Sequence, residues 1–177
     1  DRLRYLLDTY GQHPAVYRVG GRPVVSVYLS FLRSCREWEE IFRTLRAEGR
    51  DAIFLADYKD EWPNLDALNV FDGLHTYNPL NIVQNGGQVD TYLRDSYEKT
   101  GKALRYRELF EEDRPPLYWV PSVLPGYDDH LLAGRNSPVL DRQGGELFRK
   151  IFNHAVDSYP QWIYFTSWNE WWENTHI

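Results

Sequence analysis

Two glutamates near the end of the chain, Glu170 and Glu173, lie three residues apart among Trp168, Trp171 and Trp172. In an extended strand, positions i and i+3 point to opposite faces, whereas a helical turn brings their Cβ atoms to about 5–6 Å. Carboxyl groups in retaining glycosidases are about 5–5.5 Å apart, and inverting enzymes need a wider gap. A turn that follows a strand would therefore let both carboxylates act on one substrate bond.

The three tryptophans give this pair of acids a second expected property. An apolar wall disfavours the charged form of a carboxylate, and a neighbouring negative charge does the same. We expect one acid to stay protonated and serve a leaving group, while the other stays ionised as a base or nucleophile. The alternative is that both glutamates are solvated helix residues beside core tryptophans.

A second candidate stretch, "PSVLPGYDDHL", contains a Pro-Gly turn followed by Tyr127 and the acidic pair Asp128-Asp129. A metal site built on these acids and His130 is possible, but consecutive side chains diverge and no second cluster supplies further ligands. We favour turn-stabilising aspartates and expect no metal. Tyr127 is the expected contact with a substrate.

A third stretch, "FDGLHTYNP", places His75 and Tyr77 on the same face of a strand. They could line a binding site together with Tyr28 and Asn169, which also follow predicted strands. A structural role for His75 is an equally good interpretation. The chain has no G-x-S-x-G motif and no glycine-rich phosphate loop, so a nucleophilic serine and a nucleotide cofactor are disfavoured. The lone cysteine, Cys35, is interpreted as inert.

The elements that must position these residues alternate along the chain. Apolar runs predict strands at 22–30, 51–58, 70–77, 116–123 and 162–168. Helices are predicted at 1–11, 34–49, 88–106 and 142–159, the second beginning at a Ser34 cap. Strands that are apolar throughout suit a parallel sheet buried on both faces.

An open doubly wound sheet and a barrel both fit this alternation, but the nucleotide fingerprint of the open sheet is missing. Polar and aromatic residues follow several strands, where a (β/α)8 barrel has its chemistry. Five strands are too few for a closed barrel, which takes about 250 residues. We therefore predict an α/β fold of (β/α)8 TIM-barrel type, incomplete, with about five β/α units in one domain spanning residues 1–177.

Composition limits the class of partner. The 177 residues are 42% hydrophobic, with 20 basic and 26 acidic side chains interspersed and a net charge of −6. A basic stripe that would bind nucleic acid is missing, and no apolar run has the length of a membrane span. Aromatic residues reach 16%, and they make good platforms for sugar rings.

With these stretches in view, the sequence resembles glycoside hydrolase family 99, the endo-α-mannosidases and endo-α-mannanases. The resemblance runs from Gly21 to Ile177 and rests on five stretches in family order: "GRPVVSVY", "FDGLHTY", "VPSVLPGYDD", "DRQGGELF" and "TSWNEWWENTHI". It implies a (β/α)8 barrel, no cofactor, and retaining hydrolysis of internal α-mannosidic bonds in an oligosaccharide or polysaccharide. It further implies a location outside the cytoplasm, and we expect a monomer.

Carried onto matching positions, the resemblance implies that Glu170 is the base that polarises the sugar 2-hydroxyl and that Glu173 is the acid/base at the leaving oxygen. Tyr127 would line the cleft. Trp172 stands where the family commonly has histidine, and Asn174 and His176 replace its usual glycine and glutamine. An alternative hypothesis is a glycan-binding or biosynthesis-associated domain that keeps the barrel without the reaction.

Overall fold

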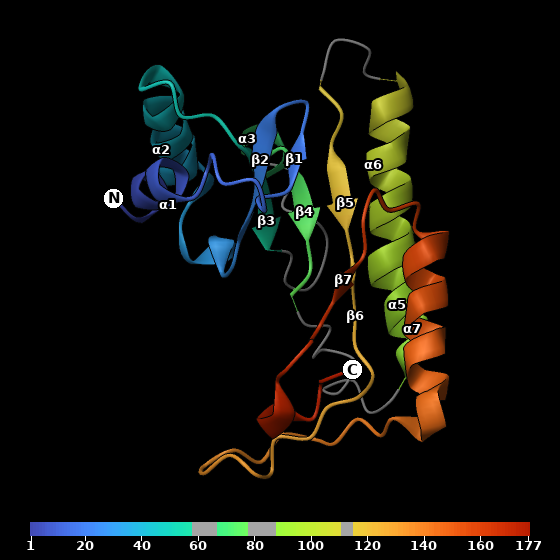
Figure 1. Ribbon diagram of the computed structural model, residues 1–177. Coiled ribbons are helices and arrows are strands. Elements are labelled where there is room, and N and C mark those ends of the chain that lie inside the picture. The colour runs from blue at the N-terminus through green and yellow to red at the C-terminus, as the bar shows by residue number, and fades with distance from the viewer. Residues whose placement is uncertain (58–66, 78–87, 111–114) are drawn as a thin grey trace.

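A curved sheet runs through the computed structural model, which describes residues 1–57, 67–77, 88–110 and 115–177 (Figure 1). Its five strands stand side by side in chain order: β1 (Arg18–Val19), β2 (Arg22–Val27), β3 (Ile53–Asp57), β4 (Gly73–His75) and β5 (Tyr118–Val120). β1 and β2 form an antiparallel hairpin, and the pairs from β2 to β5 are parallel. The predicted parallel sheet is confirmed.

The sheet continues from β5 into a second parallel pair, β6 (Ser122–Val123) and β7 (Tyr164–Phe165). Pro121 separates β5 from β6 because it has no N–H to donate to a ladder. Its carbonyl still accepts the N–H of Tyr164 at 3.0 Å, so the same extended segment pairs with β7. Parallel strands that neighbour each other in chain order are typical of a barrel, whereas a doubly wound sheet reverses its order at a switch point.

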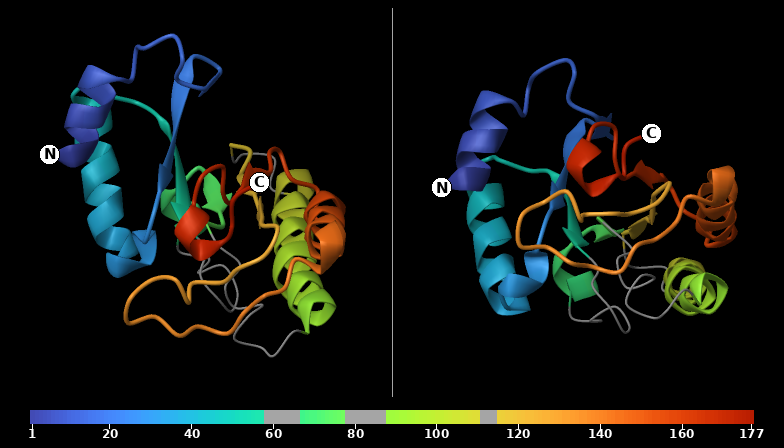
Figure 2. Two further views of the ribbon diagram at one scale, coloured as in Figure 1. Left: turned by 60° about the horizontal axis from the view of Figure 1, so that its bottom comes forward. Right: turned by 90° about the horizontal axis from the view of Figure 1, so that it is seen from below.

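The helices flank this sheet at its two ends (Figure 2). α1 (Arg2–Thr9) and α2 (Cys35–Ala47) lie at one end. α5 (Val89–Leu93), α6 (Lys99–Phe110) and α7 (Glu146–Asp157) lie at the other, and a π-helical turn at Arg94–Glu98 joins α5 to α6. A short helix, α3 (Ala67–Val70), precedes β4. None of the helices in the described part of the chain combines the length and apolarity needed to cross a bilayer.

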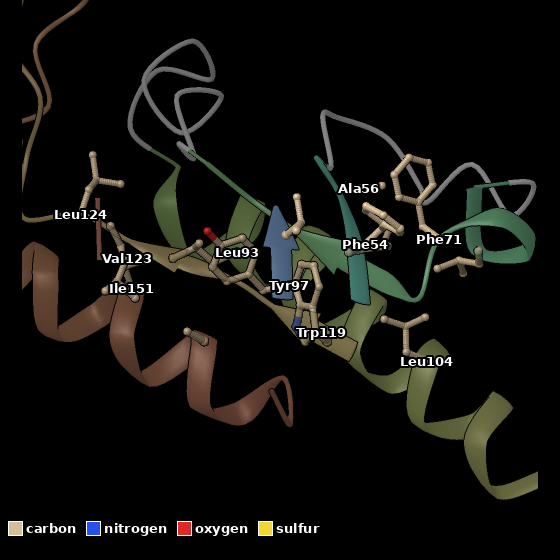
Figure 3. Packing of buried hydrophobic residues seen from close by; sticks show 14 of the residues in the cluster. Phe54, Ala56, Phe71, Leu93, Tyr97, Leu104, Trp119, Val123, Leu124 and Ile151 are labelled. Carbon is tan, nitrogen blue, oxygen red and sulfur yellow. The ribbon is translucent and has the colours of Figure 1, made fainter. Parts of the chain in front are cut away.

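β3 divides the core into two clusters because successive side chains point to opposite faces of the sheet. Phe54 and Ala56 belong to the large cluster against the helices, which Figure 3 shows with Phe71 and Trp119. The opposite face carries a small cluster centred on Ile53, Leu55 and Val120. β3 is thus buried on both faces as predicted, but β2 is not, because Ser26 on its inner face is exposed.

A buried hydroxyl network joins the end of β4 to β6. Tyr97, in the π-helical turn, donates its hydroxyl to the Ser122 carbonyl at 2.7 Å, and the Thr76 hydroxyl donates to the Ser122 Oγ at 3.0 Å. Burial raises the pKa of Tyr97 to about 12, so the phenol stays a donor. The network fixes β4 against β6, and therefore fixes the residues that follow both strands.

The sequence-based boundaries need correction in several places. The run predicted as a strand at 70–77 begins with the last residue of α3, and its paired part is only Gly73–His75. The last predicted strand, at 162–168, pairs only at Tyr164–Phe165. The hairpin strand β1 was not expected. Tyr58, at the end of the strand predicted at 51–58, and Asn78, just after the strand predicted at 70–77, lie outside the described residues.

Candidate active site

The two glutamates lie in a loop, residues 167–177, that follows β7 and closes on itself. The Ser167 N–H donates to the Thr175 carbonyl at 2.8 Å, and the Ile177 N–H donates to the Ser167 carbonyl at 3.1 Å. Inside the loop, Trp171–Glu173 form a 3-10 turn, and the Glu170 N–H that precedes it donates to the Ser167 Oγ at 2.9 Å. The turn predicted for the pair of acids is therefore present.

The charges of Glu170 and Glu173 both affect the pKa of one tyrosine, Tyr77. Burial raises the pKa of Tyr77, and the negative charges of Glu170 and Glu173 raise it further. The Tyr77 ring contacts Tyr28 edge-on, with centroids 4.9 Å apart. The Thr166 hydroxyl, at the end of β7, donates to the Tyr77 carbonyl. The structure thus brings Tyr28, Tyr77 and the two glutamates together at the ends of β2, β4 and β7.

The expectation that the tryptophans enclose the acids is wrong in this structure. Trp168, Trp171 and Trp172 are 77%, 59% and 60% exposed, and Glu170 is exposed as well. The reason is that the loop stands outside the helix-packed core, so its indole rings have little described chain to pack against. Trp171 contacts His176, with ring centroids 4.4 Å apart, and Asn169 is exposed. The rings therefore present open faces that suit a flat ligand.

Glu173 has a partner that sequence reasoning missed. Its Oε1 lies 2.5 Å from Arg135 Nη1, although the two residues are 38 positions apart. The Glu173 side chain is 19% exposed, and its backbone carbonyl accepts the Asp128 N–H at 2.9 Å. The hydrogen bond to Glu173 is the main cause that raises the pKa of Arg135. No short-range motif signals such a pairing.

Tyr127 and Asp129 are both buried beside the glutamates. The Tyr127 hydroxyl donates to Asp129 Oδ2 at 2.9 Å, and Ser137 donates to the same carboxylate through its N–H and its hydroxyl. Burial acts to raise the pKa of Asp129, but the hydrogen bonds from Ser137 and Tyr127 outweigh it and leave that pKa lowered. Asp129 therefore stabilises the turn, as favoured from the sequence. The pKa of Tyr127 is raised, and burial is the largest cause.

The neighbouring Asp128 and His130 form a surface pair. His130 Nδ1 lies 2.6 Å from Asp128 Oδ1, and this hydrogen bond raises the pKa of His130. Both side chains are well exposed. Asp128 Oδ1 also accepts the His130 backbone N–H at 3.1 Å, so the contact closes a turn.

His75 ends β4 on the inner face of the sheet, where its ring lies 5.9 Å from that of Tyr164. It is buried, and within the described part of the chain neither ring nitrogen has a hydrogen-bond partner. Burial lowers the pKa of His75, and the charge of Asp57 offsets this in part. A neutral imidazole with two unused polar atoms suits a hydroxyl-bearing ligand better than a charged one.

Two clefts lie elsewhere, on the outer helices. One of about 350 Å³ separates α1 from α2, and one of about 280 Å³ runs along α7 beside Asp90. Neither is lined by any residue of the site described above. Both clefts are lined largely by charged side chains, and in the second one Lys150 and His154 pair with Asp90.

Comparisons with known proteins identify the family of the chain. The family model described as "Glycosyl hydrolase family 99" matches residues 1–177. The chain belongs to glycosyl hydrolase family 99. A relative from Danio rerio, named glycoprotein endo-alpha-1,2-mannosidase-like protein, is 32% identical over all of this chain and 40% of its own length. The glycoprotein endo-alpha-1,2-mannosidase of Rattus norvegicus is 28% identical over 99% of this chain and 38% of its own.

Solved family 99 structures share the fold. The GH99 endo-alpha-mannosidase from Bacteroides thetaiotaomicron superposes with a TM-score of 0.76 at 27% identity, over 99% of this chain and 50% of that one. A structure titled glycoside hydrolase-like protein reaches 0.67 at 19% identity, a likeness of fold alone. The family resemblance and the incomplete barrel fold are thus confirmed. The family 99 chain spans half or less of the length of these relatives.

Proposed function

We propose that this family 99 protein is an endo-acting, retaining glycoside hydrolase that cleaves internal α-mannosidic linkages of mannan or N-glycan type. The observation that carries the proposal is the placement of Glu170 and Glu173 in one turn after β7, where both charges act on Tyr77. The printed names of the relatives, endo-alpha-1,2-mannosidases and an endo-alpha-mannosidase, support the same substrate class.

In the proposed reaction, Glu170 takes the proton of the sugar 2-hydroxyl, whose oxygen attacks C1 of the same ring. The glycosidic C1–O bond breaks, and Glu173 gives its proton to the leaving oxygen. Glu173 then removes a proton from water, which opens the 1,2-anhydro ring at C1, and Glu170 returns its proton to O2. Two displacements at C1 give net retention, and the proton count of both carboxyl groups is restored.

The surrounding side chains would bind the glycan. The open rings of Trp171 and Trp172 suit stacking on sugar faces, and Tyr28, Tyr77 and Asn169 offer polar atoms beside the acids. His75 would meet a hydroxyl from the inner face of the sheet. Tyr127 would contribute less directly than expected, because its hydroxyl is already bound to Asp129.

Replacing Glu173 tests this proposal. Glu173→Gln keeps the shape but removes the transferable proton, so turnover of an α-mannan should fall by about 10²–10⁴-fold. Binding of an α-mannan oligosaccharide, measured by calorimetry, should change little. Glu146→Gln is the matched control, since Glu146 is an exposed glutamate on α7 outside the site. Undiminished turnover by the Glu173 variant would refute the assigned role.

A second candidate function is a glycan-binding or biosynthesis-associated domain without turnover. The exposed indole rings favour it, because open aromatic faces can hold a sugar without placing its glycosidic bond against the acids. Incubating the full-length protein with α-mannan and separating the products distinguishes the two functions. Binding without released oligosaccharide supports the second one.

We also propose a location outside the cytoplasm. We further propose that the protein is a monomer, and size-exclusion chromatography with light scattering can check this oligomeric state.

A further inference from the structure

The side chain of Arg142 reaches from the stretch "DRQGGELF" to the loop that carries the two glutamates. Its Nη2 donates to the backbone carbonyl of Asn174 at 3.4 Å and to that of His176. The side chain is half-buried, and its Nε is inaccessible to solvent. A hydrogen bond from a charged donor is stronger than one between neutral groups. Arg142 therefore holds the backbone on both sides of Thr175.

Thr175 connects these carbonyls to the first glutamate. It is fully buried, and its N–H donates to the Glu170 carbonyl at 3.3 Å. Its carbonyl accepts the Ser167 N–H at 2.8 Å, and its hydroxyl lies 3.1 Å from the Ser167 Oγ. The Ser167 Oγ in turn accepts the Glu170 N–H at 2.9 Å. Both backbone groups of Glu170 are therefore fixed by way of Thr175, which Arg142 holds in place.

Glu173 is held by different contacts. Its backbone carbonyl accepts the Asp128 N–H at 2.9 Å, and its side chain pairs with Arg135. Neither of these contacts involves Arg142. The two acids thus depend on separate anchors, and a change at Arg142 should disturb Glu170 more than Glu173.

Gly126 provides the space that the Arg142 side chain occupies. A Cβ atom at position 126 would lie 2.6 Å from Arg142 Cγ and 2.9 Å from the Leu140 carbonyl oxygen. The φ of Gly126 lies outside the left-handed region, so close approach, and not backbone conformation, requires glycine here. The Pro-Gly turn and the "DRQGGELF" stretch therefore meet in one contact behind the glutamate loop.

We propose that Arg142 is a positioning residue that fixes the backbone of Glu170 through Thr175, and that Gly126 leaves room for its side chain. The consequence for turnover rests on the proposed function, since it takes Glu170 as the base. The hold on the loop does not depend on the reaction.

Hydrogen exchange of the full-length protein, resolved to single amides by fragmentation in the mass spectrometer, tests the hold without turnover. Arg142→Ala should speed exchange of the Ser167 and Thr175 N–H groups by about tenfold or more, because the charged donor that fixes their loop is lost. The Asp128 N–H, which donates to Glu173, should keep its wild-type rate. Unchanged exchange at the two loop amides, or equal acceleration at Asp128, would overturn the proposal.

The kinetics of α-mannan hydrolysis test the consequence for the reaction. Arg142→Ala should lower kcat by about 10²-fold, because a shift of about 1 Å in the base is enough for such a loss. KM should change little, since Tyr28 and Tyr77 lie outside the loop. Unchanged kcat in a variant whose loop amides exchange faster, or a rise in KM at unchanged kcat, would overturn the positioning of the base.

Two further variants serve as rescue and control. Arg142→Lys should recover part of kcat, because its ammonium keeps the charge and can donate to a carbonyl. Arg149→Ala removes an exposed arginine that pairs with Glu146 on α7, and it should change neither kcat nor loop exchange. A lysine variant as impaired as Arg142→Ala would contradict a role for the charged donor.

Gly126→Ala reaches the same contact from the other side. The added methyl should displace the Arg142 side chain and speed exchange at Thr175. It should add less in the Arg142→Ala background, where Cγ is missing. Fully additive effects would overturn the role of Gly126. Circular dichroism establishes that each variant is folded. A wild type that releases no product would refute the proposed function, while the exchange rates would still decide the hold of Arg142 on the loop.

Discussion

At the scale of single residues, Asp129 determines the form of the loop beside the glutamates. Its side chain is 1% exposed and accepts hydrogen bonds from Tyr127 and Ser137. Because its pKa is lowered in the fold, Asp129 stabilises the protein above its ordinary pKa of 3.8, and that contribution is lost as the pH falls through the lower folded value. The loop beside the acids should therefore weaken in strong acid.

Asp129→Asn tests this role. The amide cannot accept all three hydrogen bonds, so the variant should lose about 1–3 kcal/mol of unfolding free energy at pH 7. The loss should shrink as the pH drops below 3.8, because the wild type then loses the same contribution. Urea unfolding at both pH values measures it, with Asp157→Asn, an exposed aspartate at the end of α7, as control. A loss that stays constant with pH would contradict the assignment.

At the scale of elements, α2 shows how a helix start is encoded locally. The Ser34 Oγ accepts the Glu37 N–H at 3.3 Å, and the Glu37 carboxylate accepts the Ser34 N–H at 2.9 Å, which is a capping box. Ser34→Ala should cost about 1 kcal/mol of unfolding free energy. Thr44→Ala, in the same helix, should cost less, because Thr44 only bonds back to the Glu40 carbonyl. Equal losses in denaturant titrations would show that the cap is not decisive.

Elements of this kind are predictable from sequence, and their ends and surroundings are not. The cap at Ser34 and the parallel strands follow from local patterns, as does the turn that holds Glu170 and Glu173. The sequence also contains a signal for the β1–β2 hairpin, which is the glycine pair Gly20-Gly21. Both glycines adopt positive φ in the turn between the two strands. The exposure of the tryptophans and the pairing of Arg135 with Glu173 depend on which distant segments pack together, and no window of sequence contains that information.

At the scale of the whole molecule, the sheet is covered unequally on its two faces. The helices bury one face with a large cluster, in which Phe54 stacks on Phe42 with centroids 4.1 Å apart. The inner face carries only a small cluster around Leu55 in the described part of the chain. Polar groups such as His75, and the exposed Ser26, share that inner face. The asymmetry divides the two faces by chemistry, because the helix-covered face holds most of the apolar core and the polar groups lie on the inner face.

This separation predicts different costs for two neighbouring core residues of β3. Phe54 and Leu55 are both fully buried but point to opposite faces. Phe54→Ala should cost about 3–5 kcal/mol of unfolding free energy, because its surroundings are close-packed. Leu55→Ala should fall near the lower end of its class, about 2 kcal/mol, since partly exposed neighbours such as Val24 and Tyr118 can move into the space. Chemical denaturation of both variants gives the comparison. A Leu55 variant as unstable as the Phe54 variant would mean that the small inner cluster is packed as tightly as the outer one.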